Sequence, residues 1–433
     1  MKNTPKSILI CIFVSMLSAG CSLLDVTRTD SEEAVISEVE EITVCNPIPD
    51  KEISNVPLTP RQKSFVMGGN AFAIRLLDQI SSTQEGSFIF SPISVALDFS
   101  MLAAGTTDSA SEILTALGYD KSDMAEFNNY YKTLIEGLPA VDLSTKLKLS
   151  NAVIVSKAYS IKDSFRNVIQ NNYYGAVESM AFDKPDRVKQ IINDWVSKNT
   201  EGLIPEFSRD FPPEITACML NAIYFKAGWL EPFNPELTKE DVFNSPEGEV
   251  KKDFMVSQQE CDFLENDSFS CVSIPMGKKG KFSMTMVLPN KGEDINAVIG
   301  TIEKEGWESL SGKMRSEQVL VKIPKQDLKS EFDLIPLLKS VGINRVFQAS
   351  DFSLMVEQTP AIFRVSQALQ KATMTLDEGG IEAAAATFIG MEGISPQGYE
   401  QPKVKYFTAD RPYLFCIQEN TSGAILFVGL NNG

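Results

Sequence analysis

The chain has 433 residues, of which 57 are acidic and 40 are basic, and its formal net charge at pH 7 is -17. This balance argues against a nucleic-acid partner, whose phosphates would be repelled. The chain contains no histidine, so a Ser-His-Asp or Cys-His catalytic arrangement, a His-ligated zinc ion and an imidazole pH switch are all excluded. We therefore expect a protein that is not an enzyme and that needs no cofactor and no metal.

The first 20 residues have the pattern of a secretory signal peptide. Lys2 and Lys6 precede an apolar run from Ile8 to Leu17, which is too short to cross a bilayer as a helix. Cys21 directly follows Ser-Ala-Gly, which is typical of a bacterial lipoprotein signal. We predict that Cys21 is lipidated and is the mature N-terminus. The alternative is a plain secretion signal in which this cysteine is incidental.

Residues 21–60 are acidic and rich in turn-forming residues, and they lack a sustained apolar period. They predict a flexible, lipidated tether that holds the rest of the chain off a membrane surface. The expected location is the cell envelope, as an outer-membrane lipoprotein that faces the periplasm or the cell surface, with membrane contact through the lipid only. Residues 61–433 show no break in composition, so we expect one domain and a monomer.

The cysteines after Cys21 do not form a dense disulfide framework, because their number is odd and the chain is long. Cys218 and Cys416 lie in apolar runs and are expected to be core thiols. Whether Cys261 and Cys271 pair across a hairpin is left open. No spacing of these residues indicates a metal site.

The first elements of the domain follow from apolar spacing and from one proline. Residues 65–80 carry apolar side chains at helical spacing and predict a helix. Residues 88–90 predict a short apolar strand that stops before Pro92, and Pro92 opens a buried helix for which Ser91 and Ser94 are candidate caps.

Four further elements follow in the middle of the chain. Residues 151–155 predict a buried strand, and residues 191–196 predict a helix. Residues 220–229 predict an apolar strand in which Asn221 would ordinarily be a hydrogen-bonded buried polar group. Residues 282–289 alternate at a period of two, which predicts a half-buried strand.

The stretch from Leu376 to Thr387 reads Leu-Asp-Glu-Gly-Gly-Ile-Glu-Ala-Ala-Ala-Ala-Thr. Its four alanines favour a helix, but two glycines precede them and neither a cap nor a helical period follows. As a strand, the stretch has small side chains and no proline before Pro396, so it has the form of a segment that slips between two existing strands. One face then carries Ile381, Ala383, Ala385 and Thr387, and the other carries Glu382, Ala384, Ala386 and Phe388.

These motifs together resemble the serpins, the serine protease inhibitors that act by conformational trapping. The hinge of inhibitory serpins is similar to residues 370–387, their Phe-Ser-Pro-x-Ser element to residues 90–94, and a third serpin motif to residues 220–229. The resemblance extends from about Gln62 to Asn432. It implies an α+β fold with three β-sheets and about nine helices in one domain, and an exposed reactive-centre loop.

The resemblance also implies suicide trapping of a protease. The protease cleaves the loop as if it were a substrate, and the freed hinge then inserts as an extra strand of the main sheet and carries the acyl-linked enzyme to the opposite pole. The residues of the hinge on this resemblance are Glu378, Gly379, Gly380, Ile381, Glu382, Ala383, Ala384, Ala385, Ala386 and Thr387.

Further roles come from the same resemblance. Ser91, Ser94 and Asn221 would join a hydrogen-bonded shutter under the main sheet, and Trp229 would pack where the loop enters it. Lys325 would pair with the hinge glutamate, although without the resemblance it is a solvated charge at the end of a strand.

Two positions depart from the family pattern. Ile381 replaces the usual threonine or serine at the first hinge position that enters the sheet, and Gln370 replaces the shutter histidine. Ile381 is β-branched and suits a strand. Gln370 still donates and accepts hydrogen bonds, so contact with Asn221 or the shutter serines is expected. We predict that both departures are tolerated.

The usual spacing from the hinge glutamate places the reactive bond at Ile394–Ser395, with Met391–Glu392 as the next candidate. No lysine or arginine lies between Lys371 and Lys403, which argues against a trypsin-like target. The apolar residue before the bond points to elastase-, chymotrypsin- or subtilisin-like proteases, with papain-like cysteine proteases as a further class.

Two rival interpretations are kept. One is a non-inhibitory serpin whose loop is cut without inserting, which charged or proline-bearing hinges favour, and Ala383–Thr387 has neither feature. The other is a surface lipoprotein that binds glycans or a host protein. Exposed aromatic residues would favour it, but Trp195, Trp229 and Trp307 match core or family positions.

Overall fold

The computed structural model describes residues 41–42, 47–119, 124–207, 210–358, 360–381 and 403–433. The predicted signal peptide (1–20), Cys21, much of the predicted tether and residues 382–402 lie outside the described residues. The sequence predictions for those segments therefore remain predictions.

Local capping determines where the first two helices begin. The Thr59 hydroxyl accepts a hydrogen bond from the Gln62 amide, and the Gln62 side chain accepts one from the Thr59 amide, directly before Pro60. Ser91 caps the second helix ahead of Pro92. Within the described residues the helices are α1 (Pro60–Ser81), α2 (Pro92–Gly105), α3 (Ala110–Ala116), α4 (Met124–Gly137), α5 (Asp163–Tyr173), α6 (Pro185–Asn199), α7 (Ile295–Glu305), α8 (Trp307–Lys313) and α9 (Leu334–Ser340), with short 3-10 helices η1 (Leu138–Ala140), η2 (Pro235–Leu237) and η3 (Arg345–Phe347).

The strands form three sheets. They are β1 (Phe88–Phe90), β2 (Lys146–Ser156), β3 (Ala176–Met180), β4 (Ala217–Gly228), β5 (Lys239–Ser245), β6 (Gly248–Glu265), β7 (Phe269–Met276), β8 (Phe282–Pro289), β9 (Arg315–Pro324), β10 (Gln326–Asp333), β11 (Ser350–Asp351), β12 (Ile362–Phe363), β13 (Leu369–Asp377), β14 (Gly380–Ile381), β15 (Lys405–Thr408), β16 (Tyr413–Glu419) and β17 (Ile425–Asn431). The three sheets and nine helices of the described residues confirm the α+β fold that the resemblance implies.

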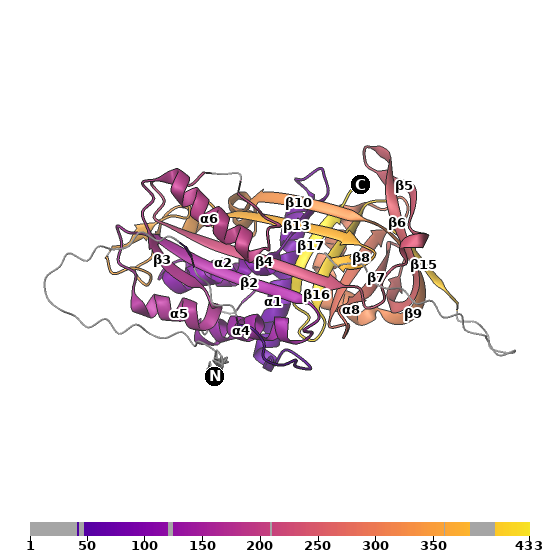
Figure 1. Ribbon diagram of the computed structural model, residues 1–433, viewed down its shortest axis with the longest axis horizontal. Helices are drawn as coiled ribbons and strands as arrows, with labels where there is room; N and C mark the ends of the chain where they lie inside the picture. The colour runs from indigo at the N-terminus through magenta and orange to yellow at the C-terminus, as the bar shows by residue number, and fades with distance from the viewer. Residues whose placement is uncertain (1–40, 43–46, 120–123, 208–209, 359, 382–402) are drawn as a thin grey trace, which may run out of the picture. The chain divides into compact units, whose positions relative to one another are not determined.

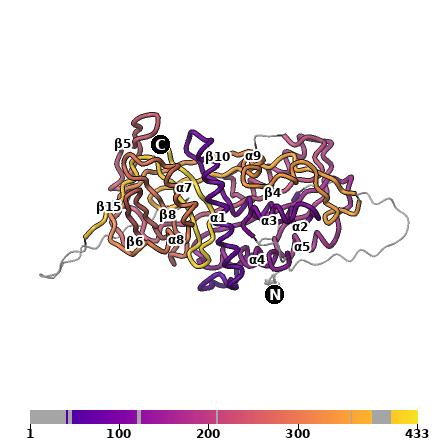
Figure 2. Tube along the Cα trace, turned by 180° about the vertical axis from the view of Figure 1, so that it is seen from behind, coloured from indigo at the N-terminus to yellow at the C-terminus, as the bar shows by residue number. Residues whose placement is uncertain are grey.

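The six-stranded sheet has the order β10-β13-β14-β4-β2-β3 and is covered on both faces. In Figure 1, α6 crosses the front face, and Figure 2 shows α2, α3 and α5 from behind. Alternation along β4 separates the two interfaces, since Leu220 and Ala222 pack with the α6 cluster whereas Phe225 and Ala227 pack with the main core. The sheet is therefore buried along most of its length.

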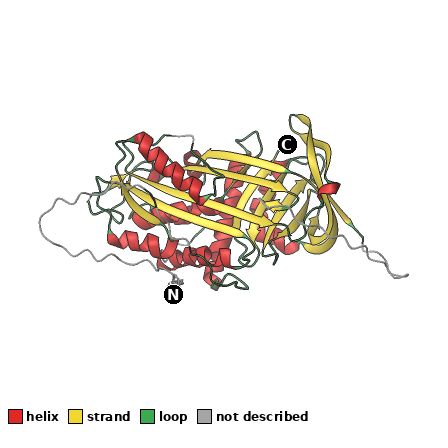
Figure 3. Ribbon diagram, in the orientation of Figure 1, coloured by secondary structure: helices red, strands yellow, loops and turns green. Residues whose placement is uncertain are grey.

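The nine-stranded sheet has the order β1-β17-β16-β8-β7-β6-β9-β15, with β5 paired to β6. Figure 3 shows these strands at the end of the domain away from α5 and α6, with most of the helices gathered around the six-stranded sheet. Among the described residues, no helix combines the length and the apolar character needed to span a bilayer.

The strand β8 differs from its sequence prediction. The alternation over residues 282–289 predicts half burial, but all eight residues of β8 are buried. β8 lies between β7 and β16 in the interior of its sheet, and its polar residues find side-chain hydrogen-bond partners. Ser283 donates to Asn420 and Thr285 donates to Ser273, so neither hydroxyl requires solvent.

The four cysteines that the structure describes are all free thiols. Cys261 and Cys271, whose pairing the sequence leaves open, lie on neighbouring strands but do not face each other. Cys261 is opposite Glu317, and Cys271 is opposite Leu264.

The described end of the predicted tether packs on the domain. The Ile53 amide donates to the Ala140 carbonyl, and the Val56 amide donates to the Thr421 hydroxyl. Val56 is buried, and it lies so close to Gly137 that a side chain at position 137 would contact Val56. Ordered packing therefore begins before α1, within residues 47–59.

Candidate functional site

The candidate site is the line where the six-stranded sheet is divided. The two-residue strand β14 lies between β13 and β4 and forms antiparallel pairs with both. The pairs are Gly380 with Gly228, Ile381 with Ala227, Ile381 with Leu376, and Gly380 with Asp377. The first residues of the predicted hinge thus already belong to the sheet.

Beyond β14, in the part of the sheet that the structure describes, β13 pairs only with β10 over residues 369–375, and β4 pairs only with β2 over residues 217–226. The facing edges of β13 and β4 therefore carry backbone groups without a strand partner among the described residues. We call this gap the slot.

Cavities follow the slot along its length. One lies directly below Ile381, between Ile223 of β4 and Ala372 of β13, and has about 390 Å³ of space including its part open to solvent. Another lies lower, between Met219 and Gln367, with about 530 Å³ counted in the same way. The slot thus combines unpaired strand edges with space for side chains, which are the two requirements for adding a strand.

Gly380 is required where the chain turns into the slot. Its φ of +129° is a conformation that L side chains rarely adopt. A Cβ at this position would lie 2.4 Å from the Ala227 carbonyl oxygen and 2.7 Å from the Gly228 Cα. Only glycine allows the backbone to approach β4 this closely.

The hinge glutamate is anchored by two donors. Lys325 Nζ lies 2.9 Å from Glu378 Oε1, and the Thr238 hydroxyl donates to the same oxygen at 2.6 Å. Burial raises the pKa of Glu378, but the hydrogen bonds from Thr238 and Lys325 and a backbone hydrogen bond outweigh it, so the net shift lowers the pKa. The structure thus brings together Lys325 and Glu378, the pair that the resemblance implies.

Trp229 fixes the backbone of the same turn. Its indole nitrogen donates to the Asp377 carbonyl at 3.0 Å, and its amide donates to the Gly379 carbonyl at 2.9 Å. The Phe233 amide adds a third bond, to the Glu378 carbonyl. Trp229 therefore lies where the hinge enters the sheet, at the position that the resemblance gives it.

Gln370 binds the start of α2 through both ends of its amide. Its Oε1 accepts from the Ser91 amide at 2.9 Å, and its Nε2 donates to the Ser91 carbonyl at 2.8 Å. The Ser91 hydroxyl donates to the Leu426 carbonyl, and the Ser94 hydroxyl donates to Ser91. The expected contact between Gln370 and a shutter serine is present, whereas contact with Asn221 is absent.

Asn221 belongs to a separate chain of hydrogen bonds. Its Nδ2 donates to Asn151 Oδ1 at 2.6 Å, and Asn151 Nδ2 donates to the Tyr173 carbonyl. The Tyr173 hydroxyl continues the chain to Asn128 Oδ1. Asn221 Oδ1 is buried and has no hydrogen-bond partner among the described residues. The shutter therefore consists of two halves, one on each side of the slot.

The remaining predicted site residues fall outside the described residues. These are the reactive bond Ile394–Ser395, the lipidation site Cys21 and the hinge residues Glu382, Ala383, Ala384, Ala385, Ala386 and Thr387. Within the described part of the chain, no group of three or more Cys, Asp or Glu side chains could hold a metal ion.

Sequence reasoning missed several groups that the structure places at the site. The role of Thr238 depends on a contact 140 residues away, and no local pattern predicts it. Asn151 gave a weak signal, because it is an amide inside an apolar strand. Asp98, which lines a neighbouring cavity, gave a clearer sequence signal, because it is the only charged residue of α2.

Comparison with known proteins identifies the arrangement. The family model described as serpin (serine protease inhibitor) matches residues 67–432. An uncharacterised serpin-like protein of Thermococcus kodakarensis is 27% identical over 395 residues, which cover 88% of this chain and 90% of the relative. Alpha-1-antitrypsin 1-5 of Mus musculus is 29% identical over 388 residues, covering 88% and 92%.

Among solved structures, the chain is similar to Serpin48 of the insect Tenebrio molitor at a TM-score of 0.77 and 25% identity. The match covers 87% of this chain and 100% of Serpin48. The thermophilic serpin tengpin in its native state gives the same TM-score at 23% identity, and covers 91% of this chain. At that identity, the similarity to tengpin bears on the fold alone.

Proposed function

This chain belongs to the serpin family, and from that premise we propose that it inhibits serine proteases by suicide trapping, with the slot between β13 and β4 as the receiving site. One observation carries the proposal: Gly380 and Ile381, the first hinge residues, already pair with both strands at the top of the slot. The strand that insertion would complete is therefore nucleated.

The register of β14 defines where each later hinge residue would lie. Because the pairing is antiparallel, each step forward along the hinge moves one residue back along β4 and β13. Ala385 would lie between Ile223 and Ala372, on the core-facing side that Ile381 occupies. Small side chains suit this space.

The same register brings Thr387 level with Asn221 and Gln370. Its hydroxyl would face the core and could donate to Asn221 Oδ1, the buried acceptor without a partner. Insertion would then connect the two halves of the shutter. In the state described here they remain separate.

The length of the hinge suits the distance that trapping requires. Residues 380–394 are about 15 residues, which span roughly 50 Å as a strand. That length would carry a protease bound at Ile394 from one end of β4 past the other. Energy released by completing the sheet would drive the step.

The composition of the loop indicates which class of protease would cleave it. Residues 372–402 contain no lysine or arginine, so the acidic pocket of a trypsin-like protease would have no cation to bind. Cleavage at Ile394–Ser395 suits elastase-, chymotrypsin- or subtilisin-like enzymes. Papain-like cysteine proteases are the second class to test.

Incubation with an elastase-like protease tests the proposal. The chain from Ser22, which retains residues 47–59, should give a complex that survives denaturing gel electrophoresis. The released C-terminal peptide should begin at Ser395. Cleavage without such a complex, across a panel of the three serine protease classes, would contradict trapping.

We also propose that Cys21 carries the lipid that places this inhibitor in the cell envelope, as a monomer. Metabolic labelling with a fatty acid tests this, because Cys21→Ser should lose both the label and the membrane association. Retention of either one would contradict the anchor.

A further inference from the structure

Asp98 is an isolated carboxylate in an apolar helix. It is the only charged residue of α2, most of whose other residues are buried. Its Oδ1 atom is shielded from water and has no hydrogen-bond partner among the residues that the structure describes, although the residue as a whole is only partly buried. A carboxylate oxygen shielded in this way is costly to keep ionised unless it is paired with a donor or a cation.

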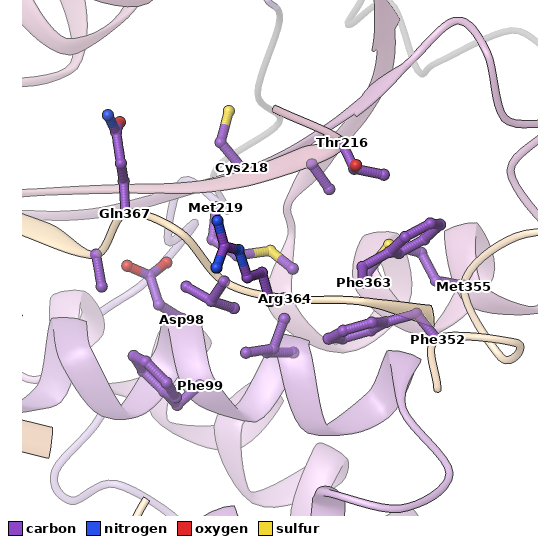
Figure 4. A pocket seen from close by; sticks show the side chains of 14 residues that line it. Asp98, Phe99, Thr216, Cys218, Met219, Phe352, Met355, Phe363, Arg364 and Gln367 are labelled. Carbon is purple, nitrogen blue, oxygen red and sulfur yellow. The ribbon is translucent and has the colours of Figure 1, made fainter. Parts of the chain in front are cut away.

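The carboxylate lines a cavity beneath the lower end of the slot. This cavity is open to solvent and has about 570 Å³ of space when its open part is counted, and its walls come from α2, β4 with the preceding Thr216, and residues 352–355 and 363–368. Figure 4 shows the Asp98 carboxylate pointing from the helix toward β4, with Arg364 beside it in this view and with Phe352 and Met355 at one end. Most of the wall is therefore apolar, and it includes three phenylalanine rings and two methionine thioethers.

Asp98, Arg364 and Cys218 are the charged or titratable groups in the cavity wall. Neither Asp98 nor Arg364 forms an ion pair with any residue that the structure describes, and Arg364 is exposed. The Cys218 side chain points to the other face of β4 in Figure 4, and burial raises the pKa of its thiol to about 12. The cavity wall therefore holds one acidic group and one cation, Arg364, and the two form no ion pair among the described residues.

We propose that this cavity binds a small apolar molecule that carries an ammonium group, which pairs with the carboxylate of Asp98. The aromatic walls would bury the apolar part, and the ammonium would supply the donor and the charge that Oδ1 lacks. An anion would be repelled by the carboxylate. A metal ion would find only one carboxylate ligand in these walls.

The proposed pairing predicts a characteristic pH dependence. Burial raises the pKa of Asp98 to about 8, so the empty cavity favours the protonated acid at neutral pH. An alkylammonium ion remains charged to about pH 10 and would favour the ionised form. Binding would then release one proton, and affinity would rise about tenfold per pH unit below pH 8 and level off above it.

The test titrates the intact mature chain with 2-phenylethylamine from pH 6 to pH 9, by calorimetry and by the methyl signals of Met219 and Met355. We expect saturable binding that shifts both methyl signals, with the pH profile given above. The anion 3-phenylpropionate should not bind. Absence of amine binding, or binding that is independent of pH, would overturn the proposal.

Variants separate the carboxylate from the cavity itself. Asp98→Asn should weaken 2-phenylethylamine at least tenfold and remove the pH dependence, whereas the neutral analogue 2-phenylethanol should bind both proteins alike and so report an intact cavity. Arg364→Gln, the matched variant at the cavity wall, should bind the amine equally or more tightly. Equal amine affinity in wild type and Asp98→Asn would contradict the assignment.

The binding site itself does not depend on the proposed function. A regulatory consequence does rest on it, because a strand inserted at the register of β14 would pass over Ala217 and Met219, which line this cavity. The bound amine would then lower the fraction of protease that is trapped. If the amine binds but the trapped fraction of protease does not fall, the regulatory consequence is wrong and the binding site is unaffected.

Discussion

Gln370 performs, with one amide group, a task for which a histidine is the family's usual residue. The amide both accepts from and donates to the backbone of Ser91, so it satisfies two buried groups at once. A neutral imidazole has one donor and one acceptor as well, but it can also take up a proton. The substitution therefore retains the link between β13 and α2 without a titratable group.

Replacing Gln370 by leucine should destabilise the protein. The side chain is 8% exposed, and its loss would leave the Ser91 amide without a partner and remove one of the two donors to the Ser91 carbonyl, which also accepts from the Val95 amide. At about 1–3 kcal/mol for the unsatisfied amide and about 1 kcal/mol for the second hydrogen bond, we expect a loss of roughly 2–4 kcal/mol in urea unfolding. The exposed Gln348→Leu should change stability by less than about 0.5 kcal/mol. Equal effects of the two substitutions would contradict the role of Gln370.

The anchor at Glu378 predicts an acid-sensitive hinge. Its pKa lies below the ordinary value of 4.5, so the stabilisation from its partners is complete above pH 4.5 and is lost as pH falls through the lowered pKa. The Trp229 indole signal should therefore shift with an inflection below pH 4.5. Glu378→Gln should remove that inflection, while the exposed Glu236→Gln should leave it unchanged.

The isoleucine at the top of the slot is a packing residue in this protein. Ile381 is 3% exposed and belongs to the main core. Restoring the family's threonine would remove apolar contact and bury a hydroxyl, so Ile381→Thr should lower stability by about 1–3 kcal/mol without raising the trapped fraction of protease. A severalfold rise in trapping would show that isoleucine impedes insertion.

At the scale of elements, insertion into the slot would explain why the core-facing positions after Ile381 carry small residues. Ala385 would lie against Ile223 and Ala372 after insertion, in the cavity below β14. Ala385→Arg should leave cleavage of the loop intact and abolish the covalent complex, because a charged side chain would be buried there. Gel analysis measures both outcomes in one experiment.

Ala385→Ser is the matched control for that substitution. It adds one small polar group and should retain most of the complex. Loss of the complex in both variants, or in neither, would contradict the proposed register.

The sequence predicted the elements of the site better than the contacts between them. The strand ending at Trp229, the capped helix at Ser91 and the hinge are local patterns, and their periods and caps are visible along the chain. The partner of Asn221 was not predictable in this way, since Asn151 lies 70 residues away and either amide or serine contact would have satisfied it.

The errors have physical causes of the same kind. Alternation in β8 predicts a solvent-facing side, but Ser283 and Thr285 are buried. Their burial is tolerated because each hydroxyl donates a hydrogen bond to a neighbouring side chain. Asp98 was overlooked because a single charge does not alter the apolar pattern of a helix. Both cases depend on distant packing, which a local period does not report.

At the scale of the whole molecule, the structure describes a domain with a sheet that is incomplete at its centre. Within the part of the chain that the structure describes, the two strands beside the slot are joined only through the two residues of β14. Completing the sheet would pair both edges and fill the cavities beneath them, so the cleaved protein should be the more stable form.

The most direct test of this account is hydrogen exchange of the slot before and after cleavage within residues 382–402. We predict that residues 217–226 and 369–375 become more strongly protected after cleavage. The amides that point into the slot, about half of those in each segment, would then acquire a strand partner. Peptides from β8, remote from the slot, should not change. Unchanged exchange along β4 and β13 in the cleaved chain would contradict insertion.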